Sequence, residues 1–254
     1  MPVLQCTCAI RIETESPDDL HDRYVVHLLD AHADWEIKQG DVDTLLRIMS
    51  NRPDWDGNLC PLARPLDIRP VLPGTTGDFV RFFEGEGFMD NPLWATCYCM
   101  FPNFTGSNEE WSERTGLENL ADKVALFKSG DAHGLLAFGD EGQPVAWCAV
   151  GPKAEMGNLP RILKGKHTEA DGIGSIFCFV VAPPYRRQGV ATRLLDAACD
   201  YLRGFQLDVA EAYPAKSAGS DAHAFHGPLE MYLQAGFATH GEAGDRMVVR
   251  RPLT

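Results

Sequence analysis

The pattern of apolar positions in the first fifty residues predicts a strand followed by two helices. Residues 6–12 alternate loosely between apolar and polar side chains, which is typical of a short strand. Ser16 and Pro17, followed by two aspartates, form a helix-start signal, and this helix is expected to run to about residue 33. Apolar residues then recur on one face over 41–49, which predicts the second helix.

A stretch rich in Pro, Asn, Asp and Gly between residues 51 and 65 predicts a linker. The chain is therefore expected to consist of a small βαα module over residues 1–57, a linker over 58–65 and a larger domain over 66–254. The sequence contains neither an internal repeat nor a low-complexity tract.

Beyond residue 65, strand and helix patterns follow one another, which predicts an α/β layered domain. The continuous apolar run over 175–182 is typical of a fully buried central strand. Two runs separated by Gly139 to Gln143 predict a hairpin. The other expected strands lie at about 66–72, 93–101, 133–138, 144–150, 207–212 and 246–251, and the expected helices at about 76–86, 109–128, 190–202 and 229–234.

The junction between the central strand and the next helix suggests anion binding. The chain there reads Val180-Val181-Ala182-Pro183-Pro184-Tyr185-Arg186-Arg187-Gln188-Gly189-Val190-Ala191-Thr192. The first amides of a helix lack partners within it and the helix dipole is positive at that end, so this junction is a ready anion site. Gly189 lets a phosphate approach the backbone, and Arg186 and Arg187 add positive charge. A turn that only packs a helix on a strand rarely needs adjacent arginines.

The run Arg186-x-x-Gly189-x-Ala191, after an apolar strand, resembles the acetyl-CoA pyrophosphate loop of GNAT acetyltransferases. The later run from Tyr232 to Phe237 (Tyr-Leu-Gln-Ala-Gly-Phe) resembles that family's Tyr-x-x-x-Gly-Phe signature. Together with the order of elements, the two motifs cover roughly the larger domain. The resemblance implies a GNAT-type α/β fold, with a mixed, mainly antiparallel central sheet flanked by helices.

The resemblance implies that a neutral primary amine attacks the thioester of acetyl-CoA, the cosubstrate, directly. Tyr232 is then the candidate general acid, because a phenol with a reference pKa of about 10 keeps its proton at neutral pH. Some relatives place a glutamate base near the start of the central strand, where this chain has Ser175. Glu211, acting directly or through water, is another candidate base, as are His223 and His226, and a surface or hydrogen-bonding role is open for each.

The resemblance also assigns the coenzyme contacts. Strand backbone groups would pair with the pantetheine arm, and the amides that follow would hold the pyrophosphate. A non-catalytic acyl-CoA sensor or scaffold is the alternative function, favoured by the absence of a carboxylate at Ser175, whereas Tyr232 favours the enzyme. The residues assigned to the coenzyme are Phe179, Val180, Val181, Arg186, Arg187, Gln188, Gly189, Val190, Ala191 and Thr192.

Two segments, residues 88–94 and 101–104, are candidates for an aromatic acceptor pocket with Asp90 nearby, or else for ordinary core. Cys97 and Cys99 alternate on an expected strand, so they are expected to share one face. Which amine is acetylated stays open, and so does the oligomeric state, for which a homodimer is one option.

The small module carries Cys6-x-Cys8 and His27-x4-His32. Two thiolates and two imidazoles suit tetrahedral zinc, and the histidine spacing is within the usual range. The segment resembles a family of short uncharacterised proteins with Cys-x-Cys-Gly, a helix and His-x4-His, although Ala9 stands where that family has Gly. Packing of these side chains in the core of the module is the alternative.

Composition narrows the classes of function. The net charge is −13, and residues 1–63 contribute −7 of it, with 5 Lys/Arg against 12 Asp/Glu. This balance argues against a general nucleic-acid binder, which needs clustered cations. No apolar run approaches the roughly 20 residues that cross a bilayer, and the N-terminus lacks the pattern of a secretory signal. We therefore expect a cytoplasmic protein whose 8 cysteines are free thiols or metal ligands.

Overall fold

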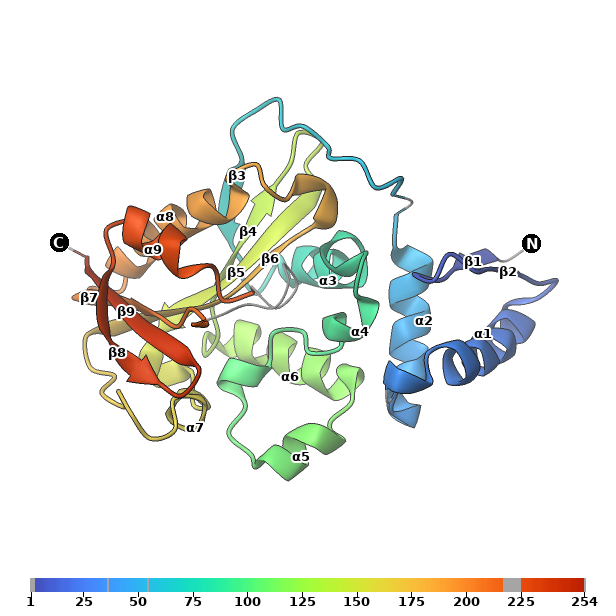
Figure 1. Ribbon diagram of the computed structural model, residues 1–254, viewed down its shortest axis with the longest axis horizontal. Coiled ribbons are helices and arrows are strands. Elements are labelled where there is room, and N and C mark those ends of the chain that lie inside the picture. Colours follow the sequence, from blue (N-terminus) through green and yellow to red (C-terminus); the bar gives the residue numbers. More distant parts are fainter. Residues whose placement is uncertain (1–2, 36, 54, 217–224, 254) are drawn as a thin grey trace.

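The computed structural model describes residues 3–35, 37–53, 55–216 and 225–253. The N-terminal module and the larger α/β domain lie side by side, and an extended segment connects them along one edge of the molecule (Figure 1). None of the helices in these ranges is long and apolar enough to cross a bilayer.

The module is a two-stranded antiparallel hairpin followed by two helices. Ser16 caps the first helix as expected, because its hydroxyl accepts a hydrogen bond from the amide of Asp19 at 3.1 Å. The elements are β1 (Val3–Gln5), β2 (Arg11–Glu13), α1 (Pro17–Ala31), η1 (Ala33–Trp35), η2 (Gln39–Asp41) and α2 (Val42–Asn51). The core of the module consists of Leu4, Cys6, Leu20, Tyr24, Leu28, Leu45 and Met49.

The expected single strand over residues 6–12 is wrong. Most of this segment is instead the turn between β1 and β2, closed by a 2.8 Å hydrogen bond from the amide of Cys6 to the carbonyl of Ile10. Ala9 has a φ of 68° there, a conformation that glycine adopts at less cost. Cys6 is buried whereas Cys8 and Ile10 are exposed, so the alternation in sequence did not mark one face of a strand.

The larger domain is built on a seven-stranded sheet of order β3-β4-β5-β6-β7-β9-β8. Neighbouring strands are antiparallel except β6 and β7, which are parallel. The expected fold class is thereby confirmed. The elements are β3 (Asp67–Pro70), α3 (Thr76–Glu84), η3 (Glu86–Phe88), α4 (Pro92–Ala95), η4 (Phe101–Asn103), α5 (Asn108–Glu113), α6 (Gly116–Ser129), β4 (Gly134–Phe138), β5 (Pro144–Pro152), η5 (Lys153–Glu155), α7 (Leu159–Ile162), β6 (Ile173–Val181), η6 (Pro183–Tyr185), α8 (Val190–Arg203), β7 (Val209–Ala212), α9 (Leu229–Gln234), β8 (Ala238–Ala243) and β9 (Arg246–Pro252).

Helices cover both faces of this sheet (Figure 1). Trp147 of β5 packs against Phe79 of α3, with ring centroids 4.9 Å apart, and against Phe127 of α6. The next residue, Cys148, lies near Cys199 of α8. Because successive side chains of a strand point to opposite faces, α3 and α6 lie on one face and α8 on the other.

The expected strand over residues 93–101 is wrong, and Cys97 and Cys99 do not share a strand face. The segment contains α4 and then a tight turn in which Tyr98 and Cys99 have φ values of 40° and 48°. Its apolar side chains are buried without strand pairing: Tyr98 and Cys99 join the core of the larger domain, and Leu93 packs against the core of the module. The edge strand β8 was not expected, because its residues are polar and mostly exposed.

The pairing of β6 opens a space in the sheet. This strand pairs with β5 from Gly174 to Val181, but with β7 only from Ile173 to Ile176. Residues 177–181 therefore have no strand partner on the side of β7. The expected buried central strand is thus present, and its second half presents one free edge.

Helix α2 holds the module against the larger domain (Figure 1). Arg47 of α2 forms a 2.8 Å ion pair with the buried Glu84 of α3, which also accepts a 2.9 Å hydrogen bond from Tyr98. Asp41 accepts a 2.5 Å hydrogen bond from the amide of Gly116 at the start of α6. These buried polar contacts fix the module next to α4 and α6.

Candidate functional site

A first cavity, of about 430 Å³, lies at the free edge of β6. It extends from residues 179–181 along the turn after β6 to the first turn of α8. Phe225, Gly227 and Met231 also line it. All the residues that the sequence assigned to the coenzyme line this cavity except Gln188.

The turn between β6 and α8 is shaped by two left-handed residues. Arg187 has a φ of 59°, and Gly189, the N-cap of α8, has a φ of 75°. A Cβ atom on Gly189 would meet no atom within 4 Å, so the space in front of the helix is open. Residues 190–192 line the cavity, and their amides have no partner inside the helix. The turn therefore leaves the positive end of α8 accessible from the cavity.

The guanidinium of Arg186 is already paired. Its two terminal nitrogens lie 2.6 and 3.1 Å from the carboxylate oxygens of Asp90, and its Nε donates to the carbonyl of Val181 at 3.0 Å. Asp90 thus lies at the first cavity, where it offsets the charge of Arg186. The positive charge expected from two adjacent arginines is correspondingly reduced.

The side chain of Gln188 turns away from the first cavity. Its Nε2 donates to the carbonyl of Cys60 at 2.9 Å, and its Oε1 accepts from the amide of Leu62 at 3.2 Å. Gln188 therefore binds the backbone of the segment that connects the module to the sheet. Its side chain is not part of the cavity wall.

Phe179 was expected to offer backbone groups to the pantetheine arm. Its amide instead donates to the carbonyl of Phe225 at 2.6 Å. The backbone of Phe225 therefore lies where a strand-like ligand would pair with β6. A ligand that used the amide of Phe179 would have to displace this hydrogen bond.

Tyr232 lies on α9 and is fully buried. Its hydroxyl donates to the carbonyl of His226 at 2.6 Å, and burial raises its pKa well above the usual range. Tyr232 does not line the first cavity, but Gly227 does, and a Cβ on Gly227 would lie 3.3 Å from the Tyr232 hydroxyl. The hydroxyl is therefore directly behind the cavity wall.

The other two residues assigned to catalysis belong to a buried polar network. The hydroxyl of Ser175 donates to that of Tyr213 at 3.1 Å, which donates to Glu211 at 2.7 Å. Glu211 is also bound by Lys153 at 2.6 Å and by Arg250 at 2.7 Å. Neither Ser175 nor Glu211 is among the residues that line the two cavities described here.

His226, another candidate base, is buried beside β6. Its Nδ1 lies 2.5 Å from the carbonyl of Phe177, and burial lowers its pKa to about 3. The imidazole is therefore neutral at neutral pH, with Nδ1 as the donor. His223 lies outside the described residues.

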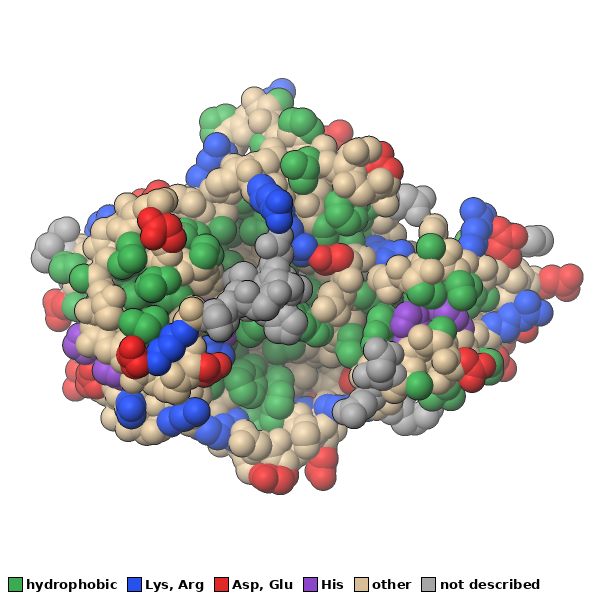
Figure 2. Space-filling model, in the orientation of Figure 1, with side chains coloured by type: hydrophobic (Ala, Val, Ile, Leu, Met, Phe, Trp, Pro, Cys, Tyr) green, Lys and Arg blue, Asp and Glu red, His purple; other side chains and the backbone are tan. Residues whose placement is uncertain are grey.

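A second cavity, of about 460 Å³, adjoins the first. Phe88, Trp94, Val180 and Phe225 line both. Hydrophobic side chains gather in a hollow at the middle of this face of the larger domain (Figure 2). The two segments expected to form an aromatic pocket contribute Phe88, Leu93, Trp94, Phe101 and Pro102 to the second cavity.

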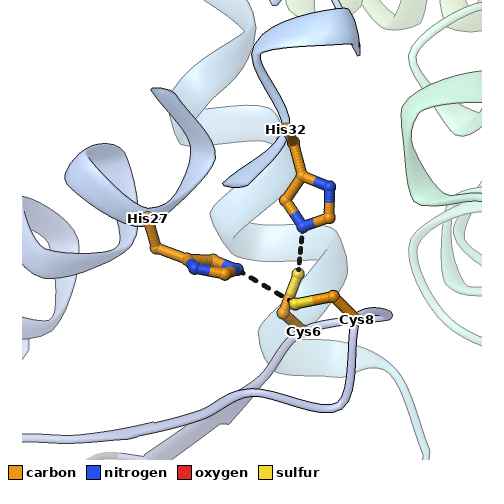
Figure 3. A group of neighbouring side chains, drawn as sticks. All are labelled: Cys6, Cys8, His27 and His32. Carbon is orange, nitrogen blue, oxygen red and sulfur yellow. Dashed lines mark hydrogen bonds between the residues drawn. The ribbon is translucent and has the colours of Figure 1, made fainter. Parts of the chain in front are cut away.

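The four Cys/His side chains of the module come together at the end of α1 (Figure 3). Sγ of Cys6 lies 3.1 Å from Nε2 of His32, and Sγ of Cys8 lies 3.4 Å from Nε2 of His27. All four potential ligand atoms lie within 4.8 Å of one another. Helix α1 ends at Ala31, which lets His32 turn toward the hairpin although an i,i+5 pair does not share a helix face.

A further group, which the sequence did not indicate, contains His167, Glu169 and His240. Their potential ligand atoms lie within 4.8 Å of one another, but Glu169 is also paired with Arg250. The three residues come from two distant segments without a characteristic spacing, so no local pattern pointed to them.

The model of the Acetyltransferase (GNAT) family matches residues 98–227, just over half of the chain. The chain belongs to the GNAT acetyltransferase family. Its enzymatic class is therefore that of an acyltransferase. The matched residues of this GNAT protein include β6, the left-handed turn and α8.

Solved GNAT structures resemble this GNAT chain at low sequence identity. The PaiA N-acetyltransferase from Thermoplasma acidophilum, in complex with coenzyme A, is 12% identical with a TM-score of 0.45, and the match covers 74% of this chain and 99% of that one. A GNAT-family acetyltransferase from Listeria monocytogenes is 10% identical with a TM-score of 0.48, covering 77% of this chain and 99% of that one. No curated protein matches the chain.

Proposed function

We propose that this GNAT protein transfers the acetyl group of acetyl-CoA to a primary amine that attacks the thioester directly. The observation that carries the proposal is the continuity of the first cavity, which joins the free edge of β6 to the N-terminus of α8. A pantetheine arm along β6 would direct the diphosphate toward the amides of residues 189–192. These amides and the helix dipole favour an anion.

The second cavity supplies a place for the amine next to the thioester. Because Val180 and Phe225 line both cavities, ligands in the two spaces would be neighbours. Holding two reactants in contact makes their reaction effectively unimolecular, which accounts for a large part of catalysis in such a site.

We assign the return of a proton to the leaving thiolate to Tyr232. Its phenol stays protonated at neutral pH, and it is separated from the first cavity by Gly227, which has no side chain. The hydroxyl would exchange its bond to the carbonyl of His226 for one to the sulfur. For the amine proton we favour a water chain fed from solvent over Glu211, whose carboxylate already binds Lys153 and Arg250.

Calorimetry with acetyl-CoA and a thiol-release assay with a panel of amines test this function. Ala191→Asp places a carboxylate where the diphosphate is expected and should weaken coenzyme binding by at least about tenfold, or 1.4 kcal/mol. Ala238→Asp adds the same charge at an exposed position of β8 and serves as the matched control. Equal affinities in the two variants, or no affinity of the parent for coenzyme A, would overturn the assignment.

Tyr232→Phe separates the enzyme from a non-catalytic acyl-CoA sensor. We expect kcat to fall by about 10²–10⁴-fold, the usual contribution of a positioned acid, with little change in the affinity for acetyl-CoA. Tyr201→Phe, which loses a hydroxyl bonded to His133 at 3.1 Å, is the control. Unchanged turnover would remove Tyr232 from the mechanism, and binding without any thiol release by the parent would favour the sensor.

We also propose that Cys6, Cys8, His27 and His32 bind a structural zinc ion. Zn–S and Zn–N bonds of about 2.3 and 2.0 Å in a tetrahedron place neighbouring ligand atoms about 3.5 Å apart. The two Cys–His separations, 3.1 and 3.4 Å, are close to that value. The four residues line neither cavity, and together they would complete a closed coordination sphere that ties the hairpin to the end of α1.

Metal analysis of protein purified without a histidine tag tests the zinc site. Near-stoichiometric zinc is expected in the parent, and its loss with a lowered Tm is expected in Cys8→Ser. Cys60→Ser, at another exposed cysteine, should keep both the metal and the Tm. Fresh, reduced protein without zinc would reject the site.

A further inference from the structure

The wall of the second cavity restricts what the acceptor can be. It is largely aromatic, with contributions from Phe83, Trp94, Phe101, Trp111 and Phe177. Phe101 and Trp111 meet edge to face, with centroids 4.9 Å apart. Aromatic side chains of this kind favour a flat apolar or aromatic ligand over a flexible polar one.

Among the described residues of this wall, Lys38 and Arg114 are basic and none is an aspartate or glutamate. Cys99, whose pKa is lowered to about 7, is the one thiol there that can carry a negative charge near neutral pH. The guanidinium of Arg114 is bonded to Asn119 at 2.8 Å and to Asp122 at 2.5 Å, so its charge is largely offset.

Lys38, unlike Arg114, is hydrogen-bonded to an uncharged group. Its ammonium donates to the backbone carbonyl of Arg114 at 2.5 Å, which is a neutral acceptor. The nearby Glu118 accepts hydrogen bonds from the amide and the hydroxyl of Thr115, which are the first causes that lower its pKa, followed by the positive charges of Arg114 and Lys38. Among the residues that the structure describes, no carboxylate forms an ion pair with Lys38 within 4 Å, so its charge still acts on the second cavity that it lines.

We propose that the second cavity takes an aromatic amine that also carries an anionic group, as an aromatic amino acid does, and that Lys38 pairs with that group. The proposal rests on the acetyl transfer proposed above. Lys38 belongs to the N-terminal module, between η1 and η2, so the module supplies a specificity-determining residue to the larger domain.

The same charge favours the chemistry of an amine acceptor. Nearby cations disfavour the protonated form of an amine, and only the neutral form attacks a thioester. Among the described residues that line the two cavities, Asp90 is the one carboxylate, and it is paired with Arg186. A cationic wall therefore favours the neutral, reactive form of the bound amine without a carboxylate base. It also disfavours polyamines, which carry several positive charges.

Thiol release with matched pairs of amines tests the proposal. L-Phenylalanine is compared with phenethylamine, and L-tryptophan with tryptamine, because each pair differs only in the carboxylate. We expect kcat/KM for the acid-bearing member to be at least about tenfold higher, which is 1.4 kcal/mol. Lys38→Met should abolish that preference by lowering kcat/KM for the amino acids alone, whereas Lys38→Arg should keep it. Lys128→Met, at an exposed lysine of α6, is the control.

Equal rates within each pair, a preference for spermidine, or an unchanged preference in Lys38→Met would overturn the proposal while leaving acetyl transfer intact. Failure of the parent to bind coenzyme A or to acetylate any amine would instead overturn the proposed function. Calorimetry with coenzyme A shows that each variant is folded, since Lys38 does not line the first cavity.

Discussion

The ammonium of Lys153 lies 2.6 Å from a carboxylate oxygen of Glu211, and the two side chains are 3% and 0% exposed. Arg250 binds the other oxygen of the same carboxylate. Tyr213 adds a hydrogen bond at 2.7 Å. This network joins η5, β7 and β9 at the end of the sheet, so its main effect is to hold these elements together.

Glu211→Gln should destabilise the fold. The substitution leaves the buried Lys153 without its negative partner, whereas Arg250 keeps its pair with Glu169. Breaking a buried pair in this way costs about 3–5 kcal/mol. The free energy of unfolding in urea measures the loss. Glu242→Gln, which breaks an exposed pair with Lys216, is the control and should change stability by no more than about 0.5 kcal/mol.

An equal stability of the two glutamine variants would contradict the structural role of this carboxylate. The folded Glu211→Gln protein also tests the candidate base. A pH–rate profile that overlays that of the parent excludes Glu211 from the proton transfer.

Local patterns in the sequence predicted the parts of the fold that local forces determine. The central strand was recognisable because residues 173–181 are apolar on both faces. Helix α1 was recognisable from Ser16 and Pro17, and the turn before α8 from Gly189 and its basic neighbours. Each of these signals lies within a few residues of the element that it specifies.

The parts that sequence did not predict depend on partners distant in the chain. Arg186 is paired with Asp90, and the side chain of Gln188 with the backbone of Cys60 and Leu62, contacts that no local spacing indicates. The apolar residues 93–101 are buried without strand pairing, Tyr98 and Cys99 in the core of the larger domain and Leu93 against the core of the module. Nothing in the sequence places Lys38 of the module at a cavity of the larger domain.

Gly134→Ala should destabilise the sheet. An added Cβ on Gly134 of β4 would lie 1.9 Å from Cη2 of the buried Trp147, so the indole or the strand must move. Overpacking of a core in this way costs about 1–3 kcal/mol. Gly77→Ala is the matched control, because a Cβ there meets no atom within 4 Å and alanine favours the helix by up to about 1 kcal/mol. Thermal unfolding of the two variants should shift Tm in opposite directions, and a shift in the same direction would count against this packing.

Cys99 should react with iodoacetamide faster than an ordinary thiol near neutral pH. A hydrogen bond with the thiol of Cys178 and the nearby Lys123 lower the pKa of Cys99 to about 7. Both thiols line the second cavity, which gives a small reagent access. The rate of alkylation of Cys99 should therefore reach a plateau near pH 8. The rate for free cysteine, with a reference pKa of about 8.5, should continue to rise above that pH.

Peptide mass spectrometry locates the label on Cys99. Burial raises the pKa of the neighbouring Cys97 to about 11, so Cys97 should stay unlabelled in the same peptide. Cys178→Ala removes the hydrogen bond and should shift the rate profile of Cys99 to higher pH. An unshifted profile would show that Cys178 does not stabilise the thiolate.

His226 should make the fold less stable as the pH falls below 6.5. Its pKa is about 3 in the folded protein because it is buried, and about 6.5 in an unfolded chain. Between these values the unfolded state binds a proton that the folded state does not, so stability is lost on acidification. From pH 7 to pH 5 this residue alone should remove about 2 kcal/mol from the free energy of unfolding.

Urea unfolding of the parent and of His226→Asn at pH 7, 6 and 5 measures this contribution of His226 to the free energy of unfolding. Asparagine keeps a donor near the carbonyl of Phe177 but does not titrate, so the stabilities of the two proteins should converge as the pH falls. His21 should show the opposite pH dependence. Its hydrogen bond to Asp22 raises its pKa, so its contribution to the free energy of unfolding should grow as the pH falls. Parallel stability curves for the parent and His226→Asn would show that His226 takes up a proton in the folded protein as readily as in the unfolded chain. It would then carry a positive charge beside β6 below about pH 6.5, contrary to the burial that lowers its pKa.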